Sequence, residues 1–139
     1  MKEERILAID YGKKRVGLAI TDPLKMFAYP FDTFINDKNL LTKLIDIIKE
    51  KNVVKVIVGD PVKESGEESV IAKEIRKFIE SLSKKIDIPI ELVDERYTSE
   101  LAKQRIIETV PSKKKRRDKS LVDKNAAAIM LEDYLKETL

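Results

Sequence analysis

The most constraining feature of the sequence is the apolar run at residues 6–9 and the way it ends. The run is followed by Asp10, Tyr11 and Gly12. A continuous apolar run of this length is typical of a strand that is buried on both faces. Gly12 favours a tight turn into a second apolar run, 16–20, so the two runs predict a hairpin. Asp10 is then a carboxylate at the carboxyl end of a buried strand, which suggests that this acid has a function.

Composition limits the chemistry that such a carboxylate can perform. The chain of 139 residues, 42% of them apolar, is long enough for one domain, 1–139, with one core. It has no histidine and no cysteine, which excludes Ser-His-Asp and Cys-His catalysis. A metal site must therefore use oxygen ligands, which favour Mg²⁺ or Mn²⁺. We expect no membrane span, because no stretch approaches about 18 apolar residues, and the absence of cysteine fits a cytoplasmic location.

The rest of the chain alternates between predicted strands and helices. The aromatic stretch 26–34 indicates a third strand, and Pro30 within it indicates an edge position. Apolar residues at helical spacing predict helices over 38–51 and 67–84, and a β-branched run predicts a buried strand over 53–58. Further predicted elements are a strand over 88–93, a helix from Thr98 or Ser99 to about 109, and a last helix from 121 to about 136.

This order of elements predicts an α/β domain. The helices between the first, fourth and fifth strands favour right-handed crossovers, which make these three strands parallel. Strands one to three follow one another without a helix and are expected to be antiparallel. The sequence therefore predicts a mixed five-stranded sheet with helices on both faces.

Acids follow the ends of the three strands that are expected to be parallel. Asp10 closes the first, Asp60 follows the fourth, and Asp94 and Glu95 close the fifth. Ligands of open α/β sheets bind outside the carboxyl ends of the strands. These acids are therefore predicted to share one rim of the sheet.

Asp123 joins them from the last predicted helix. It shares a helical stripe with Ala127, Met130 and Tyr134, and this apolar stripe must face the sheet. Small residues at 126–128 would let the helix approach closely. We therefore expect Asp123 to point inward, toward the other acids.

Carboxylates gathered in one place repel one another, and a divalent cation relieves the repulsion. Two cations about 3.5–4 Å apart can activate a water, orient a scissile phosphate and stabilise the leaving oxygen. This chemistry needs no histidine. It suits hydrolysis of a phosphodiester bond.

Each acid also has a plain structural interpretation. Asp10 and Asp60 are common turn residues, beside Gly12 and Pro61 respectively. Residues 94–96 are compatible with a surface ion-pair cluster, and Asp123 with an acid that a helix start favours. The shared rim is what favours a site over these interpretations for Asp10, Glu95 and Asp123.

Positive charge is concentrated near the same acids. A basic loop precedes Asp123, and Arg15 and Arg96 lie beside the predicted rim. Because phosphate contacts supply much of the affinity for nucleic acid, cations beside an acidic site suit an enzyme that cuts a polyanion. The candidate substrate-binding residues are Lys14, Arg15, Arg96, Thr98, Lys113, Lys114, Lys115, Arg116 and Arg117.

Four short motifs resemble those of the YqgF (RuvX) family. They are Ile9-Asp10-Tyr11-Gly12 with 14–17 and 21–22, Val58-Gly59-Asp60-Pro61 with Gly66, residues 94–99, and residues 122–127. The resemblance spans almost the whole chain, with the motifs in order. It implies an RNase H-like fold related to Holliday-junction resolvases, and a bacterial cytoplasmic nuclease for the 5′ end of the small-subunit rRNA precursor.

The resemblance also implies roles for individual residues. Asp10, Glu95 and Asp123 would be the metal-binding acids, and Arg15 and Arg96 would hold phosphate or brace the acids. Two positions depart from the family pattern. Asp60 stands where the family usually has leucine, and Ser99 where it often has threonine.

Three hypotheses follow from the sequence, beside a weaker fourth, a phosphate-binding ATPase fragment, which rests on the Asp-x-Gly turn at residues 10–12. The first is an endonuclease dependent on Mg²⁺ or Mn²⁺ that acts on structured RNA, most simply an rRNA precursor, in association with the ribosome precursor. The second is a resolvase of branched DNA, which generally calls for a homodimer rather than a monomer. The third is an RNA-binding assembly or transcription factor without turnover.

Overall fold

The computed structural model describes residues 3–60, 69–94 and 119–138. The predicted helix that starts at Thr98 or Ser99 and the basic residues 113–118 lie outside the described residues. None of the helices in the described part combines the length and apolar character that a membrane span requires. In chain order, the elements are β1 (Arg5–Tyr11), β2 (Arg15–Thr21), β3 (Ala28–Ile35), α1 (Leu40–Glu50), β4 (Val53–Asp60), α2 (Val70–Ser83), β5 (Ile90–Asp94) and α5 (Lys119–Thr138).

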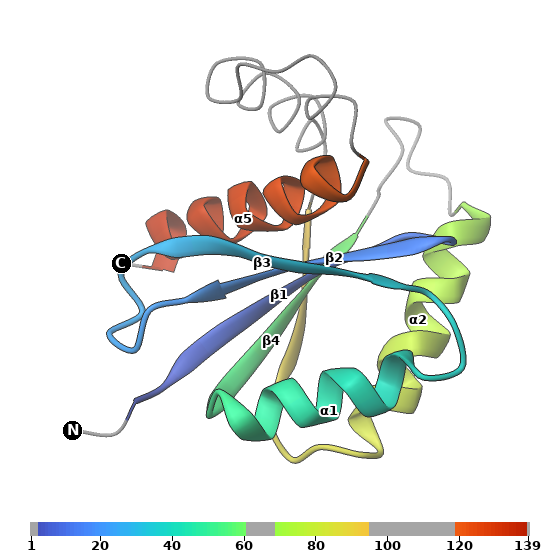
Figure 1. Cartoon of the computed structure of the whole chain (residues 1–139), viewed down its shortest axis with the longest axis horizontal. Coiled ribbons are helices and arrows are strands. Elements are labelled where there is room, and N and C mark those ends of the chain that lie inside the picture. The colour runs from blue at the N-terminus through green and yellow to red at the C-terminus, as the bar shows by residue number, and fades with distance from the viewer. Residues whose placement is uncertain (1–2, 61–68, 95–118, 139) are drawn as a thin grey trace.

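The strands form one mixed sheet in the order β3-β2-β1-β4-β5 (Figure 1). β1 pairs antiparallel with β2, and β2 with β3, whereas β1, β4 and β5 are parallel. Figure 1 shows α5 on one side of this sheet and α1 and α2 on the other. The predicted five-stranded α/β architecture, with its strand directions and helices on both faces, is confirmed.

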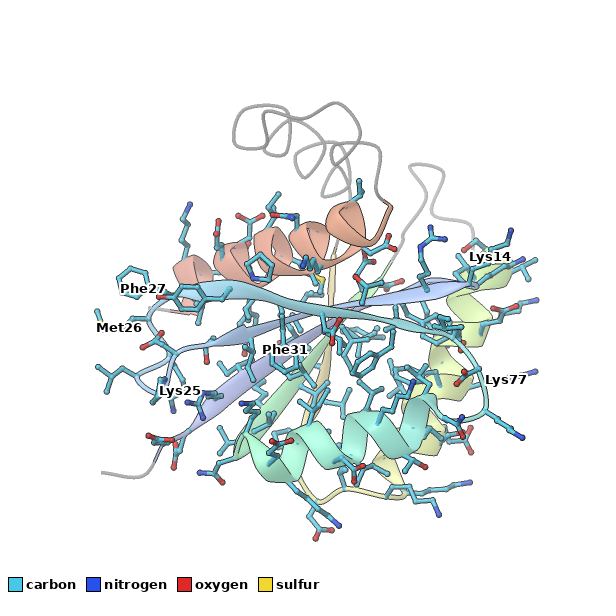
Figure 2. All side chains as sticks on the ribbon, in the orientation of Figure 1. Lys14, Lys25, Met26, Phe27, Phe31 and Lys77 are labelled. Carbon is cyan, nitrogen blue, oxygen red and sulfur yellow. The ribbon has the colours of Figure 1, made fainter. Side chains whose placement is uncertain are left out.

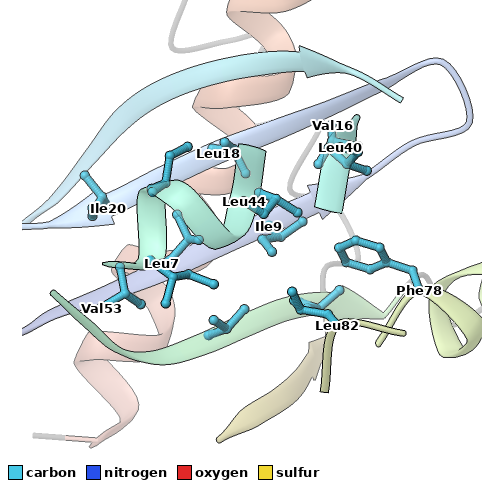
Figure 3. Packing of buried hydrophobic residues seen from close by; sticks show 14 of the residues in the cluster. Leu7, Ile9, Val16, Leu18, Ile20, Leu40, Leu44, Val53, Phe78 and Leu82 are labelled. Carbon is cyan, nitrogen blue, oxygen red and sulfur yellow. The ribbon is translucent and has the colours of Figure 1, made fainter. Parts of the chain in front are cut away.

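Alternation along β1 divides the core between the two faces of the sheet. Leu7 and Ile9 belong to a large aliphatic cluster under α1 and α2, whose packing Figure 3 shows from close by. Ile6 and Ala8 belong to a second cluster, under α5. Since successive side chains of a strand point to opposite faces, the parity of a position decides which helices it meets.

Five predicted starts shift by two or three residues. The third strand begins at Ala28 and not at 26, the helix predicted over 38–51 begins at Leu40, and the last helix begins at Lys119 and not at 121. The other two shifts have a visible cause. The predicted helix over 67–84 begins at Val70, because Ser69 is extended and its side chain accepts the N–H of Ala72 at 3.2 Å, as an N-cap does. The predicted strand over 88–93 begins at Ile90. Pro89 lacks an N–H, but its carbonyl accepts the N–H of Val56 at 3.0 Å and so leads the chain into the sheet.

Pro30 lies in the edge strand β3, as predicted. The pairing of β2 with β3 slips between Leu18 and Ala19, whose partners are Asp32 and Pro30. Phe31 is therefore an extra residue, as in a β-bulge. Proline and the bulge both interrupt the pattern of N–H groups along this edge.

Helix α5 packs closely on the sheet through alanines. Ala127 and Ala128 are fully buried, in the same cluster as Ala8 and Ala19 of the strands. Met130 and Tyr134, which continue the predicted apolar stripe of this helix, are buried in the same cluster. A larger side chain at 127 has no room unless the helix moves away from the sheet.

We therefore expect Ala127→Leu to lower the free energy of unfolding by about 1–3 kcal/mol, because it overpacks the interface between α5 and the sheet. Urea unfolding followed by circular dichroism measures this change. Asp133→Leu adds the same side chain at an exposed position of α5 and should change stability by less than about 0.5 kcal/mol. Equal effects of the two substitutions would contradict the packing described.

A polar cluster joins α5 to β4 and β5 on the face of the sheet that α5 covers. The Lys55 Nζ atom of β4 lies 2.8 Å from the Glu91 Oε2 atom of β5 and donates to the hydroxyl of Tyr134 in α5. The hydrogen bond to Glu91, and then that to Tyr134, raises the pKa of Lys55. The hydrogen bond from Lys55 lowers the pKa of Glu91.

These shifts predict a pH-dependent contribution to stability. The lowered pKa of Glu91 means that its contribution is present above the ordinary carboxyl range and is lost as the pH falls through the lowered value. The raised pKa of Lys55 means that its contribution is lost only as the pH rises through that raised value. At neutral pH, Glu91→Gln should therefore cost up to about 1 kcal/mol, because the pair is partly exposed.

Denaturant unfolding at several pH values tests this expectation. The difference between wild type and Glu91→Gln should vanish in acid, where the wild-type carboxylate is protonated. Lys55→Met and the double variant complete a mutant cycle. Strict additivity of the two single losses at neutral pH would show that the pair contributes nothing.

Candidate active site

Asp10 lies at the carboxyl end of β1, on the face that α5 covers. It follows Ile6 and Ala8 at a spacing of two, so it shares their face of the strand. Both of these residues pack in the cluster under α5. Its partner in the antiparallel pairing with β2 is Gly17. Residues paired directly in this way share a face of the sheet, so Gly17 also faces α5.

Gly17 allows the backbone of α5 to approach β2. A Cβ atom at position 17 would lie 2.1 Å from the carbonyl oxygen of Asp123 and 3.0 Å from its Cβ atom. The first turns of α5 therefore rest on the bare backbone of Gly17. Since Gly17 pairs with Asp10, this contact brings Asp10 and Asp123 to the same end of the same face.

Arg15 completes this group. It is two residues from Gly17 on the same strand and therefore on the same face. Its Nε atom donates to the Oδ2 atom of Asp123 at 2.8 Å, and both side chains are partly exposed, at 34% and 23%. A charge-assisted hydrogen bond of this length fixes the Asp123 carboxylate while leaving it accessible to solvent.

Asp60 lies on the other face of the sheet. It follows Val56 and Val58 at a spacing of two, and both valines pack in the cluster under α1 and α2. Its partner in the parallel pairing with β5 is Asp94. Asp60 thus ends a strand at the predicted rim, but alternation turns it away from Asp10 and Asp123.

The remaining candidates lie outside the described residues. These are Glu95, Arg96, Thr98 and the basic residues Lys113, Lys114, Lys115, Arg116 and Arg117. Among the residues that the structure describes, no three acids, histidines or cysteines are grouped so that they could hold a metal ion. The side chains of Asp10 and Asp123 are nevertheless of the kind that suits a hard divalent cation, because carboxylate oxygens are the ligands that such a cation prefers.

Two residues shape the site or its strands in a way that the sequence did not reveal. Gly17 reads as part of an apolar run, and its contact with Asp123 becomes visible only when α5 is placed. Thr21 is buried, and its hydroxyl accepts the N–H of Ile6 at 2.9 Å, which ties β2 to the start of β1. A threonine at the end of a predicted strand gives no such signal.

Asp22 has a structural part in the turn that follows. Its carboxylate accepts the N–H groups of Leu24, Met26 and Phe27 at 3.1, 2.9 and 2.7 Å. It therefore orders the connection between β2 and β3. This position lies at the opposite end of β2 from Arg15 and takes no part in the group around Asp123.

Because position 17 meets backbone atoms of Asp123, we expect Gly17→Ala to lower the free energy of unfolding by about 1–3 kcal/mol. Urea unfolding measures the loss. The clash is with the main chain, so truncating the side chain in Gly17→Ala/Asp123→Ala should not restore stability. Recovery in that double variant would show that the side chain, not the backbone, is what Gly17 accommodates.

The chain is similar to known proteins over nearly its full length. The family described as "RuvX: Holliday junction resolvase" matches residues 4–137 of the chain. A protein of Phocaeicola vulgatus named "Putative pre-16S rRNA nuclease" is 44% identical over 133 residues, which cover 95% of this chain and 95% of that protein. A protein of Chlorobium phaeobacteroides with the same name is 44% identical over 136 residues, covering 97% and 94%.

Among solved structures, the chain is similar to RuvC of T. thermophilus, determined in complex with a Holliday junction substrate. The TM-score is 0.61 at 13% sequence identity, and the match covers 97% of this chain and 95% of that one. A likeness at this identity concerns the fold alone. It confirms the RNase H-like architecture that the sequence predicts.

Proposed function

Because the chain belongs to the RuvX family of nucleases, we propose that it is a metal-dependent endonuclease that cuts structured RNA at the 5′ end of a 16S rRNA precursor. Relatives that share 44% of its residues over nearly their full length are named as pre-16S rRNA nucleases. The observation that carries the proposal is the contact between Gly17 and Asp123, which joins two acids from opposite ends of the chain.

In this proposal, Asp10, Asp123 and Glu95 hold one or two Mg²⁺ or Mn²⁺ ions. Glu95 follows β5 directly in the sequence and belongs to the motif at residues 94–99 that resembles the family's. When bound, such ions supply Lewis-acid stabilisation of the phosphoryl oxygens and a more acidic water.

The residues of the chain have separate tasks. Arg15 holds the Asp123 carboxylate through its Nε atom, and because its side chain is partly exposed, its guanidinium can also donate to a phosphate. Lys14, exposed in the turn between β1 and β2, adds a second cation beside Asp10. Arg96, Thr98 and the basic residues 113–117 are proposed as further contacts to the RNA backbone.

A second candidate function is resolution of branched DNA. The description of the matching family favours it. Hydrolysis at either substrate would use the same acids, so the chemistry of the site does not choose between them. The substrate that is cut and the oligomeric state distinguish the two functions, because symmetric cutting of two DNA strands generally calls for a dimer.

We expect Asp10→Asn and Asp123→Asn to lower the rate of phosphodiester hydrolysis at least about 100-fold. Each removes a negative charge that would hold the cation, and the cation's stabilisation of the transition state is worth several kcal/mol; about 1.4 kcal/mol corresponds to a factor of ten. Asp60→Asn is the matched control, since the same change on the other face of the sheet should leave the rate unchanged. Single-turnover cleavage of a labelled substrate measures all three.

The same assay separates the two candidate substrates. Structured RNA that spans a 16S precursor end and a four-way DNA junction are each incubated with Mg²⁺, Mn²⁺ or EDTA. Cleavage of RNA that is lost with EDTA and in Asp10→Asn supports the proposal. Cleavage confined to the junction would assign the second function, and full activity of Asp10→Asn would remove this site from catalysis.

A further inference from the structure

A cavity of about 330 Å³ opens on the face of the sheet opposite to Asp10. It lies between the start of α1 and the exposed side of α2. This volume is within the range of about 300–1,000 Å³ that small-molecule sites occupy. Its lining residues are Tyr11, Asn36, Asp37, Lys38, Leu40, Leu41, Glu74, Lys77, Phe78 and Ser81.

The cavity is adjacent to the candidate active site along the chain. Tyr11, which lines it, follows Asp10 directly and therefore points to the other face of β1. The connection between β1 and β2 separates the two places. Asn36 fastens this connection to the cavity, because its Nδ2 atom donates to the carbonyl of Gly12 at 2.8 Å and its N–H donates to the carbonyl of Lys14 at 2.9 Å.

Exposed lysines mark a path from one place to the other. Lys14 lies in the connection between β1 and β2, and Lys77 lies at the mouth of the cavity. Figure 2 shows both at the same end of the molecule. A nucleic-acid strand with one phosphate at Asp10 would meet Lys14 as it passes the connection between β1 and β2, and Lys77 as it reaches the cavity. Successive phosphates would therefore lie near cations.

The walls of the cavity suit a flat ring. The ring centroids of Tyr11 and Phe78 are 4.8 Å apart with an angle of 36° between their planes. Leu40 and Leu41 supply the apolar surface of α1. Aromatic and aliphatic side chains arranged in this way offer a stacking surface to a base, as in proteins that bind single-stranded nucleic acid.

The polar groups narrow the choice of ring. Asp37 and Glu74 also line the cavity, and carboxylates accept hydrogen bonds from amino groups. One oxygen of Asp37 already accepts the N–H of Asn39 at 2.9 Å, which leaves its other oxygen for a ligand. Adenine, cytosine and guanine carry an exocyclic amino group, whereas uracil does not. The two acids repel a bare phosphate. A phosphate is therefore expected at the exposed Lys38 and Lys77, which also line the cavity.

We propose that this cavity binds one unpaired nucleobase of the substrate strand, preferably one with an exocyclic amino group, close to the phosphate that lies at Asp10. This inference rests on the proposed nuclease function and specifies its substrate. A base enters the cavity only when it is free of its pairing partner. The enzyme should therefore cut next to a single-stranded nucleotide rather than within a continuous duplex.

Substitutions on α2 test the cavity without touching the core. Ser81 is exposed and lines the cavity, so Ser81→Trp should fill its mouth. Ser83→Trp, two residues along the same helix and also exposed, does not line it and serves as the control. Lys77→Ala and Lys73→Ala form a second pair of the same kind, and urea unfolding checks that all four variants fold.

Binding is measured in EDTA, by fluorescence anisotropy of a short labelled oligoadenylate. Stacking of one base predicts that Ser81→Trp binds about 5-fold to 100-fold more weakly than wild type, whereas Ser83→Trp binds unchanged. Oligouridylate, and oligoadenylate with one abasic position, should bind more weakly than intact oligoadenylate. Lys77→Ala should weaken binding and flatten its salt dependence, and Lys73→Ala should change neither.

Several results would overturn the proposal. These are equal affinities of Ser81→Trp and Ser83→Trp, equal affinities of the wild type for oligoadenylate and oligouridylate, or no binding of single-stranded RNA by the wild type. Free AMP that binds as tightly as the oligonucleotide would assign the cavity to a mononucleotide instead. The binding assay contains no metal, so a cavity that binds bases in a protein without nuclease activity would refute the proposed function alone.

Discussion

The close approach of α5 to β2 at Gly17 is the contact on which the candidate site depends. It places the carbonyl of Asp123 where any other residue would put a side chain. Because the pairing of β1 with β2 sets Asp10 opposite Gly17, one missing methyl group determines the relation between two distant acids. Arg15 then fixes the carboxylate that the helix delivers. Backbone packing therefore positions Asp123, and the charged side chain of Arg15 holds it.

The alternation of side chains along β1 explains how the carboxyl end of one strand meets two different environments. Odd positions of β1 meet aliphatic and aromatic side chains of α1 and α2, whereas even positions meet α5. Asp10 and Tyr11 are neighbours in sequence, yet one lies in the charged group and the other lines a cavity with a stacked ring pair. Asp60 belongs to the second environment, which is why an additional acid at the same rim leaves the group around Asp123 undisturbed.

Much of this arrangement could be predicted from local patterns. Apolar and β-branched runs identified the strands, Pro30 identified the edge, and the stripe through Ala127 predicted which side of α5 faces the sheet. These signals depend on residues close together in the chain. The contact of Gly17 with α5 and the face of Asp60 depend on register and on packing between distant segments, which no local pattern encodes. The starts of α2 and β5 lie later than predicted. The glutamates at 67 and 68 favour a helix by composition and Ile88 is apolar, so the local pattern does not show that Ser69 caps the helix or that Pro89 precedes the strand.

The irregular edge of β3 bears on how copies of this protein can associate. Many proteins dimerise by joining edge strands into one continuous sheet, which requires an uninterrupted ladder of donors and acceptors. Pro30 removes one donor, and the extra residue Phe31 shifts the remainder out of phase. A symmetric pair built through β3 would lose hydrogen bonds at its centre. Edge-to-edge pairing of two copies through β3 is therefore disfavoured by the strand itself.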